Sequence, residues 1–370
     1  MNKINLQKAI ELRHLLHQHP ELSMEEKRTK KTLMEFLKKH TNLEVRDRGR
    51  WFYAVYRKGK GVKNIAFRAD FDAIKVEEGI VLPYGSKNPG VAHKCGHDGH
   101  SAALAGLAME VDQQGVDQNV FFLFQHAEEI AKGAVECREI IDEEKIDEIY
   151  AFHNRSGAPR HAVQVIDGTS NFGSVGMVIE MKGSPTHASQ PEFGKNPAYA
   201  IARVITGLEK ATKEAGSQGL LLSTVVGVDV GEGAFGIAAS EGKLLITLRG
   251  EIEAELEGLL KNVEKLASKE GAADGLDMKI SYEDRFPVTS NDKKSVDNVR
   301  RVAKQIGVPL IELEEGMRGS EDFGYYLEKT QGALFFIGNG EGHPEIHTEG
   351  YDFPDDIIET AVKMFTGLLE

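Results

Sequence analysis

The sequence is poor in cysteine and has no long apolar run. Only Cys95 and Cys137 occur among its 370 residues, so a disulfide scaffold is excluded and a reducing compartment is expected. No apolar run is long enough to span a bilayer, and residues 1–8 contain no apolar signal core. From these absences we predict a soluble, cytoplasmic protein.

Basic residues are outnumbered by acidic ones. The 45 Lys and Arg against 58 Asp and Glu leave a net charge of −13, which argues against nucleic acid or an anionic membrane as the main partner. A chain of this length forms one large or two medium domains. An apolar fraction of 41% with 39 glycines is typical of a globular α/β protein. We find no internal repeat and no low-complexity tract.

What the chain does contain is a dense cluster of ligand-type side chains at residues 93–100. The thiol of Cys95 and the imidazole of His97 form a ligand pair suited to Zn, Co, Ni or Mn. Gly96 and Gly99 let the backbone bend so that both side chains can converge. Taken alone, the cluster also fits a closed zinc site or a hydrogen-bonded turn, although a closed site normally needs four ligands with paired cysteines.

Three predicted strands end in polar or metal-competent groups. The strands cover residues 64–70, 119–125 and 148–154, and the groups are Asp70, Glu128-Glu129 and His153. Open α/β sheets bind ligands at the carboxyl ends of their strands. We therefore expect these side chains to meet at one edge of a mostly parallel sheet.

A different pattern covers the middle of the chain. From residue 173 to 286 the expected element order is β-α-β-β-α-β, which is that of a ferredoxin-like α+β domain. We predict that this domain is inserted into a larger domain formed by residues 1–172 and 287–370, which carries the metal-competent groups.

Two helices are expected near the N-terminus. The first covers residues 3–18, and the second begins after Ser23 and runs to about Lys39. In the segment between them Ser23 is the expected N-cap and Glu26 occupies the capping-box position. His14, His17 and His19 are predicted to be surface or turn histidines.

The motifs together resemble the metal-dependent amidohydrolases of the aminoacylase, hippurate hydrolase and carboxypeptidase G group. The likeness is closest to the branch with N-acyl-amino acid amidohydrolases, N-acetyldiaminopimelate deacetylase and auxin-conjugate hydrolases. The matching segments are residues 16–26, 68–73, 93–100, 126–129, 152–154, 183–191, 319–327 and 347–356. They span nearly the full chain.

The resemblance implies a site for two divalent ions (Zn, Mn, Co or Ni). Cys95 would bridge the ions, His97 and His153 would complete one, and Glu129 and His347 the other. Without the resemblance, His153 reads as a packed strand-end histidine and His347 as a surface residue.

The resemblance also implies roles around the metals. Glu128 would be the general base, Asp70 would hydrogen-bond to a ligand imidazole, and His187 would stabilise the oxyanion. Taken alone, Glu128-Glu129 fits a solvated acidic pair and His187 a turn histidine. Arg249 is a candidate substrate-carboxylate clamp, or else a surface arginine at a strand end. Gly236 stands where many relatives carry an asparagine, so substrate specificity stays open.

The expected function is hydrolysis of an N-acyl-amino acid or a similar small amide by a metal-activated water. The expected assembly is a homodimer formed through the inserted domain, which would also act as a lid. Two alternatives remain: a dipeptidase or carboxypeptidase on the same scaffold, and a non-catalytic metal-dependent binding protein. The intact Glu128 beside a complete ligand set argues against the second.

Overall fold

The computed structural model describes residues 1–216 and 218–370, and the chain divides into two compact units. Unit 1 comprises Met1–Ser170, Thr289–Gly316 and Glu321–Glu370, and unit 2 comprises Asn171–Val288 and Met317–Ser320. The inserted domain predicted at residues 173–286 stays a prediction. The assignment of Met317–Ser320 to unit 2 was not expected.

Unit 1 is built on an eight-stranded sheet in the order β1-β2-β4-β3-β5-β14-β6-β13. Its strands are β1 (Glu44–Arg48), β2 (Trp51–Tyr56), β3 (Asn64–Asp70), β4 (Asn119–Gln125), β5 (Glu148–Ser156), β6 (Val163–Val165), β13 (Leu310–Glu312) and β14 (Gln331–Gly340). The central strands β4, β3, β5 and β14 are mutually parallel. Every residue of β4 is buried, because a central parallel strand is covered on both faces. A small sheet pairs β7 (Gly168–Asn171) with β12 (Thr289–Asn291).

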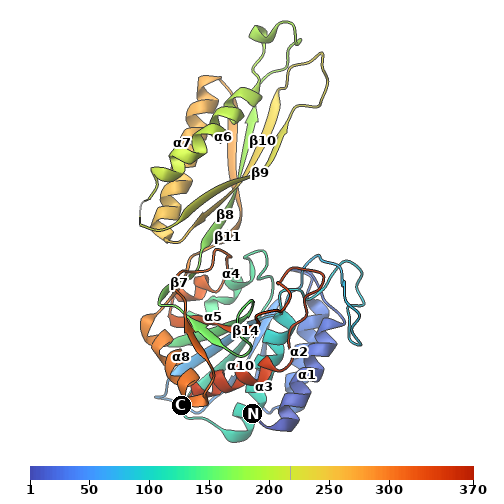
Figure 1. Cartoon of the computed structure of the whole chain (residues 1–370), viewed down its shortest axis with the longest axis vertical. Helices are drawn as coiled ribbons and strands as arrows, with labels where there is room; N and C mark the ends of the chain where they lie inside the picture. The colour runs from blue at the N-terminus through green and yellow to red at the C-terminus, as the bar shows by residue number, and fades with distance from the viewer. Residues whose placement is uncertain (217) are drawn as a thin grey trace. The chain divides into compact units, whose positions relative to one another are not determined.

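The helices of unit 1 are α1 (Lys3–His17), α2 (Lys27–His40), α3 (His97–Gln114), α4 (Gly133–Cys137), α5 (Glu139–Glu143), α8 (Lys293–Ile306), α9 (Gly324–Leu327) and α10 (Ile357–Gly367). Helix α3 packs with α1, α10 and β3 (Figure 1). It is buried from His97 to Val111. A Cβ on Gly99 would lie 2.4 Å from the ring of Phe353, so glycine permits this close packing.

The loop before α3 turns at Gly96, which has φ +103°. This left-handed conformation favours glycine, and a Cβ there would lie 2.3 Å from Oδ1 of Asn154. Gly96 therefore lets the chain reverse between Cys95 and His97.

The predicted capping box before α2 is wrong. The helix begins at Lys27, and Glu26 at its N-cap makes no side-chain cap hydrogen bond. The carboxylate of Glu21 caps the helix instead, accepting from the backbone N and Oγ1 of Thr29 at 2.8 and 2.9 Å.

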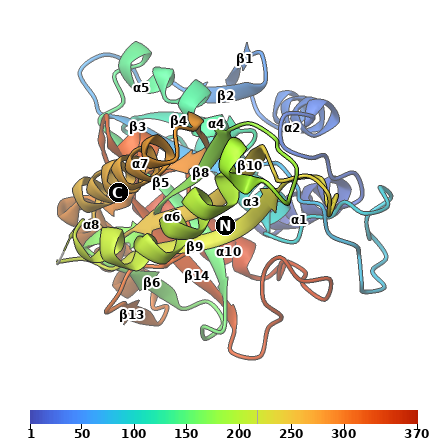
Figure 2. The same ribbon diagram turned by 90° about the horizontal axis from the view of Figure 1, so that it is seen from above.

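Unit 2 has a four-stranded antiparallel sheet in the order β11-β8-β10-β9. Its elements are β8 (Gly173–Lys182), the short 3-10 helix η1 (Pro191–Phe193), α6 (Pro197–Lys213), β9 (Leu221–Val230), β10 (Glu241–Gly250), α7 (Glu253–Ala273) and β11 (Asp277–Phe286). Helices α6 and α7 lie side by side on one face of this sheet (Figures 1 and 2). Apart from η1, this is the predicted β-α-β-β-α-β order. Among the described residues, no helix is both long enough and apolar enough to cross a membrane.

His17 is buried, contrary to the expectation of a surface or turn histidine. Its Nδ1 lies 2.8 Å from Oδ2 of Asp98, and its Nε2 lies 2.8 Å from Oε2 of Glu78. Burial opposes the charged imidazole, but the hydrogen bonds with both carboxylates outweigh it and raise the pKa of His17 to about 9. The charged imidazole therefore contributes to stability.

We expect the free energy of unfolding to fall as pH rises from 6.5, the ordinary pKa of histidine, to about 9. A group whose pKa is raised on folding stabilises the fold below its unfolded pKa and loses that contribution as it deprotonates. The loss is at most about 3 kcal/mol. Urea unfolding across this range should show the slope in the wild type and a weaker slope in His17→Gln.

The control for this measurement is His40→Gln. Burial and the nearby Lys8 and Lys39 lower the pKa of His40, so its titration lies below the tested range. Equal pH slopes in the wild type and in His17→Gln would contradict the assignment.

Candidate metal centre

The carboxyl ends of four parallel strands meet at one edge of the unit 1 sheet. Asp70 ends β3, Glu128 and Glu129 follow β4, and His153 lies in β5 near its end. His347 lies in the loop after β14, and Cys95 and His97 come from the loop that opens α3. The parallel register explains why segments distant in sequence approach each other here.

The structure brings both predicted ligand sets together. Ligand-type atoms of Cys95, His97 and His153 lie within 4.8 Å of one another, and so do those of Cys95, Glu129 and His347. Cys95 is common to both sets, which is the arrangement that a bridging thiolate requires.

The spacing between these atoms suits a shared ion. Sγ of Cys95 lies 3.4 Å from Nε2 of His153, and Nε2 of His347 lies 3.4 Å from Oε1 of Glu129. Two ligand atoms bound tetrahedrally to one zinc-sized ion are about 3.3–3.8 Å apart. His347 has φ +62°, and its backbone N donates to the carbonyl of Lys94 at 2.7 Å. This bond ties the His347 loop to the loop that carries Cys95.

The imidazole rings of His97 and His153 are each oriented by a hydrogen bond at Nδ1, the nitrogen that faces away from the cluster. Nδ1 of His97 lies 3.1 Å from Oδ1 of Asp72, and Nδ1 of His153 lies 2.8 Å from the carbonyl of Asn154. With Nδ1 as the donor, Nε2 of each ring is left as an electron-pair donor toward the cluster.

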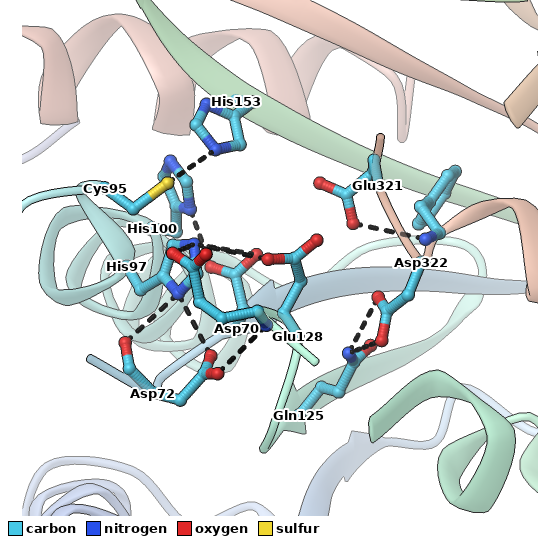
Figure 3. A network of polar contacts seen from close by, with 12 residues as sticks. Asp70, Asp72, Cys95, His97, His100, Gln125, Glu128, His153, Glu321 and Asp322 are labelled. Atoms are coloured by element: carbon cyan, nitrogen blue, oxygen red, sulfur yellow. Dashed lines mark hydrogen bonds and ion pairs between the residues drawn. The ribbon is translucent and has the colours of Figure 1, made fainter. Parts of the chain in front are cut away.

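Asp70, expected to hydrogen-bond to a ligand imidazole, contacts a histidine outside the two predicted ligand sets. Its Oδ1 lies 2.6 Å from Nδ1 of His100, whereas its Oδ2 is 3.8 Å from Nε2 of His97, beyond hydrogen-bond distance. Asp72, two residues later, contacts the imidazole of the predicted ligand His97 (Figure 3).

The residues of the cluster fit divalent metal ions. Among the described residues, Nε2 of His97 and Oε1 of Glu129 are buried and have no hydrogen-bond partner. Burial and the nearby Glu129 and Glu128 raise the pKa of the Cys95 thiol well above its usual range. A thiolate is therefore disfavoured here unless a cation compensates its charge. The donor set of one thiol, three imidazoles and one carboxylate suits Zn, Co, Ni or Mn.

Glu128 lies beside the cluster and faces a second group of carboxylates. Its carboxylate lies between Asp70 and the pair Glu321-Asp322 (Figure 3). Burial and the charges of Glu321 and Glu129 raise the pKa of Glu128 well above its usual range. Divalent ions beside Glu128 would offset this effect and favour the carboxylate form, which is the form that can accept a proton.

Arg68 compensates part of this negative charge. Its guanidinium contacts Asp70 at 2.5 Å, Asp322 at 2.6 Å and Glu321 at 3.0 Å. Nε of Arg68 donates to Gln125 at 2.8 Å. Arg68 thereby joins the end of β3 to the turn before α9.

Sequence reasoning assigned no role to Arg68, Asp72, Glu321 or Asp322. Each of them lies inside a segment that carried the family resemblance, at 68–73 or 319–327. The resemblance therefore marked these segments as part of the site. The spacing of the four residues along the chain does not indicate which groups they contact.

The other predicted site residues belong to unit 2. His187 is exposed, with Nδ1 2.7 Å from Oγ of Ser189. Nη1 of Arg249 donates to the carbonyl of Arg318 and to Oγ of Ser320 at 3.0 and 2.8 Å. Arg249 therefore holds the returning Met317–Ser320 segment within its own unit.

Comparisons with known proteins agree with this arrangement. The model of peptidase family M20/M25/M40 matches residues 66–370. The chain is 30% identical to hippurate hydrolase of Campylobacter jejuni, covering 96% of this chain and 94% of the relative. It is 27% identical to N-acetylcysteine deacetylase of Bacillus subtilis, and the match covers 98% of this chain and 96% of the relative. A solved structure, a dinuclear metal binding peptidase of the M20 family from Bacillus subtilis, superposes on this chain with a TM-score of 0.85 at 25% identity. The superposition covers 100% of this chain and 98% of the other.

We expect metal to protect Cys95 from alkylation. A metal-bound thiol is deprotonated and occupied by the ion. Iodoacetamide, applied at a pH high enough to ionise the free thiol, should therefore label Cys95 after chelator treatment and much less in protein reloaded with Co²⁺ or Zn²⁺. Mass spectrometry of the labelled peptides measures this. Cys137, which is buried in α4 and belongs to neither ligand set, serves as the internal control. Equal labelling of Cys95 in both forms would contradict its role as a ligand.

Proposed function

Because the chain belongs to peptidase family M20/M25/M40, we propose that its metal centre hydrolyses the amide bond of N-acyl-amino acids. The observation that carries the proposal is the complete pair of ligand sets with Glu128 beside them. The names of the relatives, N-acetylcysteine deacetylase and hippurate hydrolase, indicate acylated amino acids as the substrate class.

We assign the ligands as the two sets indicate. Cys95, His97 and His153 would hold one divalent ion, and Cys95, Glu129 and His347 would hold the other. When bound, the ions supply a Lewis acid for the amide carbonyl and make water a better nucleophile at neutral pH.

Glu128 is the proposed general base. Its carboxylate takes a proton from the attacking water and passes it to the leaving nitrogen, which departs as an amine. Beside Glu128, the guanidinium of Arg68 forms ion pairs with Glu321 and Asp322 and so fixes their positions. Asp72 keeps the His97 imidazole in the tautomer that presents Nε2.

Unit 2 supplies two further proposed residues. His187 stabilises the oxyanion, and Arg249 recognises the substrate carboxylate, although Arg249 is engaged with Arg318 and Ser320 here. A Cβ at Gly236 would meet nothing within 4 Å, so packing does not require glycine at the position where the family resemblance implies an asparagine.

We further propose a homodimer through unit 2. Strand β9 is at the edge of its sheet and exposes Val226 and Val228, and Tyr199 is exposed on α6. An open strand edge with apolar side chains favours pairing with a second copy. In such a dimer His187 acts on the site of the partner. A cytoplasmic location is supported by Cys95 and Cys137 being free thiols.

We expect the wild type, supplied with Mn²⁺, Co²⁺, Ni²⁺ or Zn²⁺, to hydrolyse acetyl- or benzoyl-amino acids faster than dipeptides. Glu128→Gln should bind metal normally and lose ~100–10,000-fold in kcat, since it lacks the base. A ninhydrin assay of released amine and elemental analysis of bound metal measure both. Glu139→Gln, at an exposed glutamate on α5, is the control.

Faster cleavage of dipeptides would favour the dipeptidase alternative. Metal binding without any hydrolysis across the screen would favour a binding protein. A fully active Glu128→Gln variant would remove the assignment of the base.

We expect activity to return when inactive Glu128→Gln and inactive His187→Ala proteins are mixed. If His187 works in trans, a mixed dimer contains one site with both groups intact. Subunit exchange is followed with two affinity tags on the two variants. A mixture that exchanges subunits and stays inactive would show that His187 acts within its own chain or not at all.

A further inference from the structure

The segment Pro20–Glu26 was expected to cap α2, yet its polar side chains point elsewhere. Glu21 alone provides the observed side-chain cap through Thr29. Ser23 and Glu26, the two residues of the expected capping box, make hydrogen bonds to the loops around the metal centre. Their contacts suggest a different role for this segment.

Glu26 contacts the turn that carries both site glutamates. It is 5% exposed, and its Oε1 accepts from the backbone N of Ala127 at 2.8 Å. Ala127 has φ +48°, a left-handed conformation that is unfavourable for a residue with a side chain. The carbonyl of Ala127 accepts from the backbone N of Lys132 and of Gly133 at 3.2 and 3.0 Å. Both the backbone N and the carbonyl of Ala127 are therefore hydrogen-bonded.

This turn solves a geometric problem at Glu128 and Glu129. In an extended strand, adjacent side chains point to opposite sides. The left-handed residue before them changes the direction of the chain, and ligand-type atoms of both glutamates lie within 4.8 Å of His97. The hydrogen bond that Glu26 accepts from Ala127 stabilises this left-handed conformation.

Ser23 contacts the carboxylate that orients a metal ligand. Its Oγ donates to Oδ2 of Asp72 at 2.7 Å. The same oxygen accepts from the backbone N of Glu129 at 3.1 Å, and the other oxygen of Asp72 lies 3.1 Å from Nδ1 of His97. Ser23 is therefore one contact away from two predicted ligands.

The backbone of the segment is itself unusual. Met24, between Ser23 and Glu26, has φ +72°. Such strain persists where the surroundings enforce it, and it is common at functional sites. The segment is fastened beside the end of β3, because the backbone N of Ala73 donates to the carbonyl of Glu21 at 2.9 Å.

We propose that Glu26 and Ser23 are positioning residues of the metal centre. Glu26 fixes the turn that aims Glu128 and Glu129, and Ser23 fixes Asp72 against His97. The proposal rests on the proposed hydrolytic function only for its kinetic test, since metal retention requires no substrate.

The main test compares two substitutions of Glu26. Glu26→Met removes the acceptor for Ala127, whereas Glu26→Gln keeps an amide oxygen in the same place. Protein loaded with Co²⁺ is challenged with a chelator, and its visible absorption spectrum reports the ligand geometry. Glu26→Met should hold one of the two Co²⁺ equivalents ~10–100-fold more weakly and show an altered spectrum. Glu26→Gln should restore both to near wild type.

The kinetic readout separates positioning from substrate binding. Glu26→Met should lower kcat with little change in KM, because Glu26 touches neither the substrate nor the ions. The matched control is Glu21→Met, which removes the cap of α2. It should lower the melting temperature and leave Co²⁺ retention, spectrum and kcat as in the wild type.

Wild-type Co²⁺ retention and spectrum in folded Glu26→Met would overturn the role of Glu26. If Glu26→Met does not fold, Ser23→Ala decides the proposal: we expect weaker Co²⁺ retention, rescued by Ser23→Thr, and retention equal to wild type would overturn it. If the wild type cleaves no N-acyl-amino acid, the proposed function fails while the Co²⁺ measurements still decide the role of this segment.

Discussion

Compensation of buried negative charge is the interaction on which the site depends. Asp70, Asp72, Glu128, Glu321 and Asp322 are all buried at one edge of the unit 1 sheet. Removing carboxylates from water is costly unless cations or hydrogen-bond donors replace the water. Arg68 compensates three of these groups. The cluster of thiol, imidazoles and carboxylate beside them provides the place for further positive charge, and divalent ions fit its donor atoms.

A second constraint is that the ligands come from separate loops and must reach one place. Parallel strands bring the loop starts to the same edge, but side-chain direction depends on individual turns. Gly96, Ala127 and His347 all have positive φ, and each lies at or beside a predicted ligand or the predicted base. Hydrogen bonds from the surrounding chain hold Ala127 and His347 in place. The left-handed residues therefore lie where they direct side chains into the candidate metal cluster.

Much of the site could be predicted because its ligands are chemically distinctive and follow recognisable strands. Cys95 and His97 stand out by spacing, and Glu129 and His153 by their position at buried strands. The partners of these residues were predicted less well. Asp70 and Asp72 both follow β3 and differ by two positions, yet only Asp72 hydrogen-bonds to His97. Ser23 and Glu26 have the spacing of a capping box, and the cap is provided by Glu21.

The sequence by itself determined the fold class and the order of elements in unit 2, since these depend on local apolar patterns. The predicted metal ligands came from the family resemblance together with residue chemistry. Only the tertiary structure decided which carboxylate orients which imidazole and which glutamate holds which turn. The bond between Glu26 and Ala127 joins residues 101 positions apart. Such a pairing depends on where the packed strands and the left-handed turns place each donor and acceptor. A local sequence pattern cannot predict that geometry.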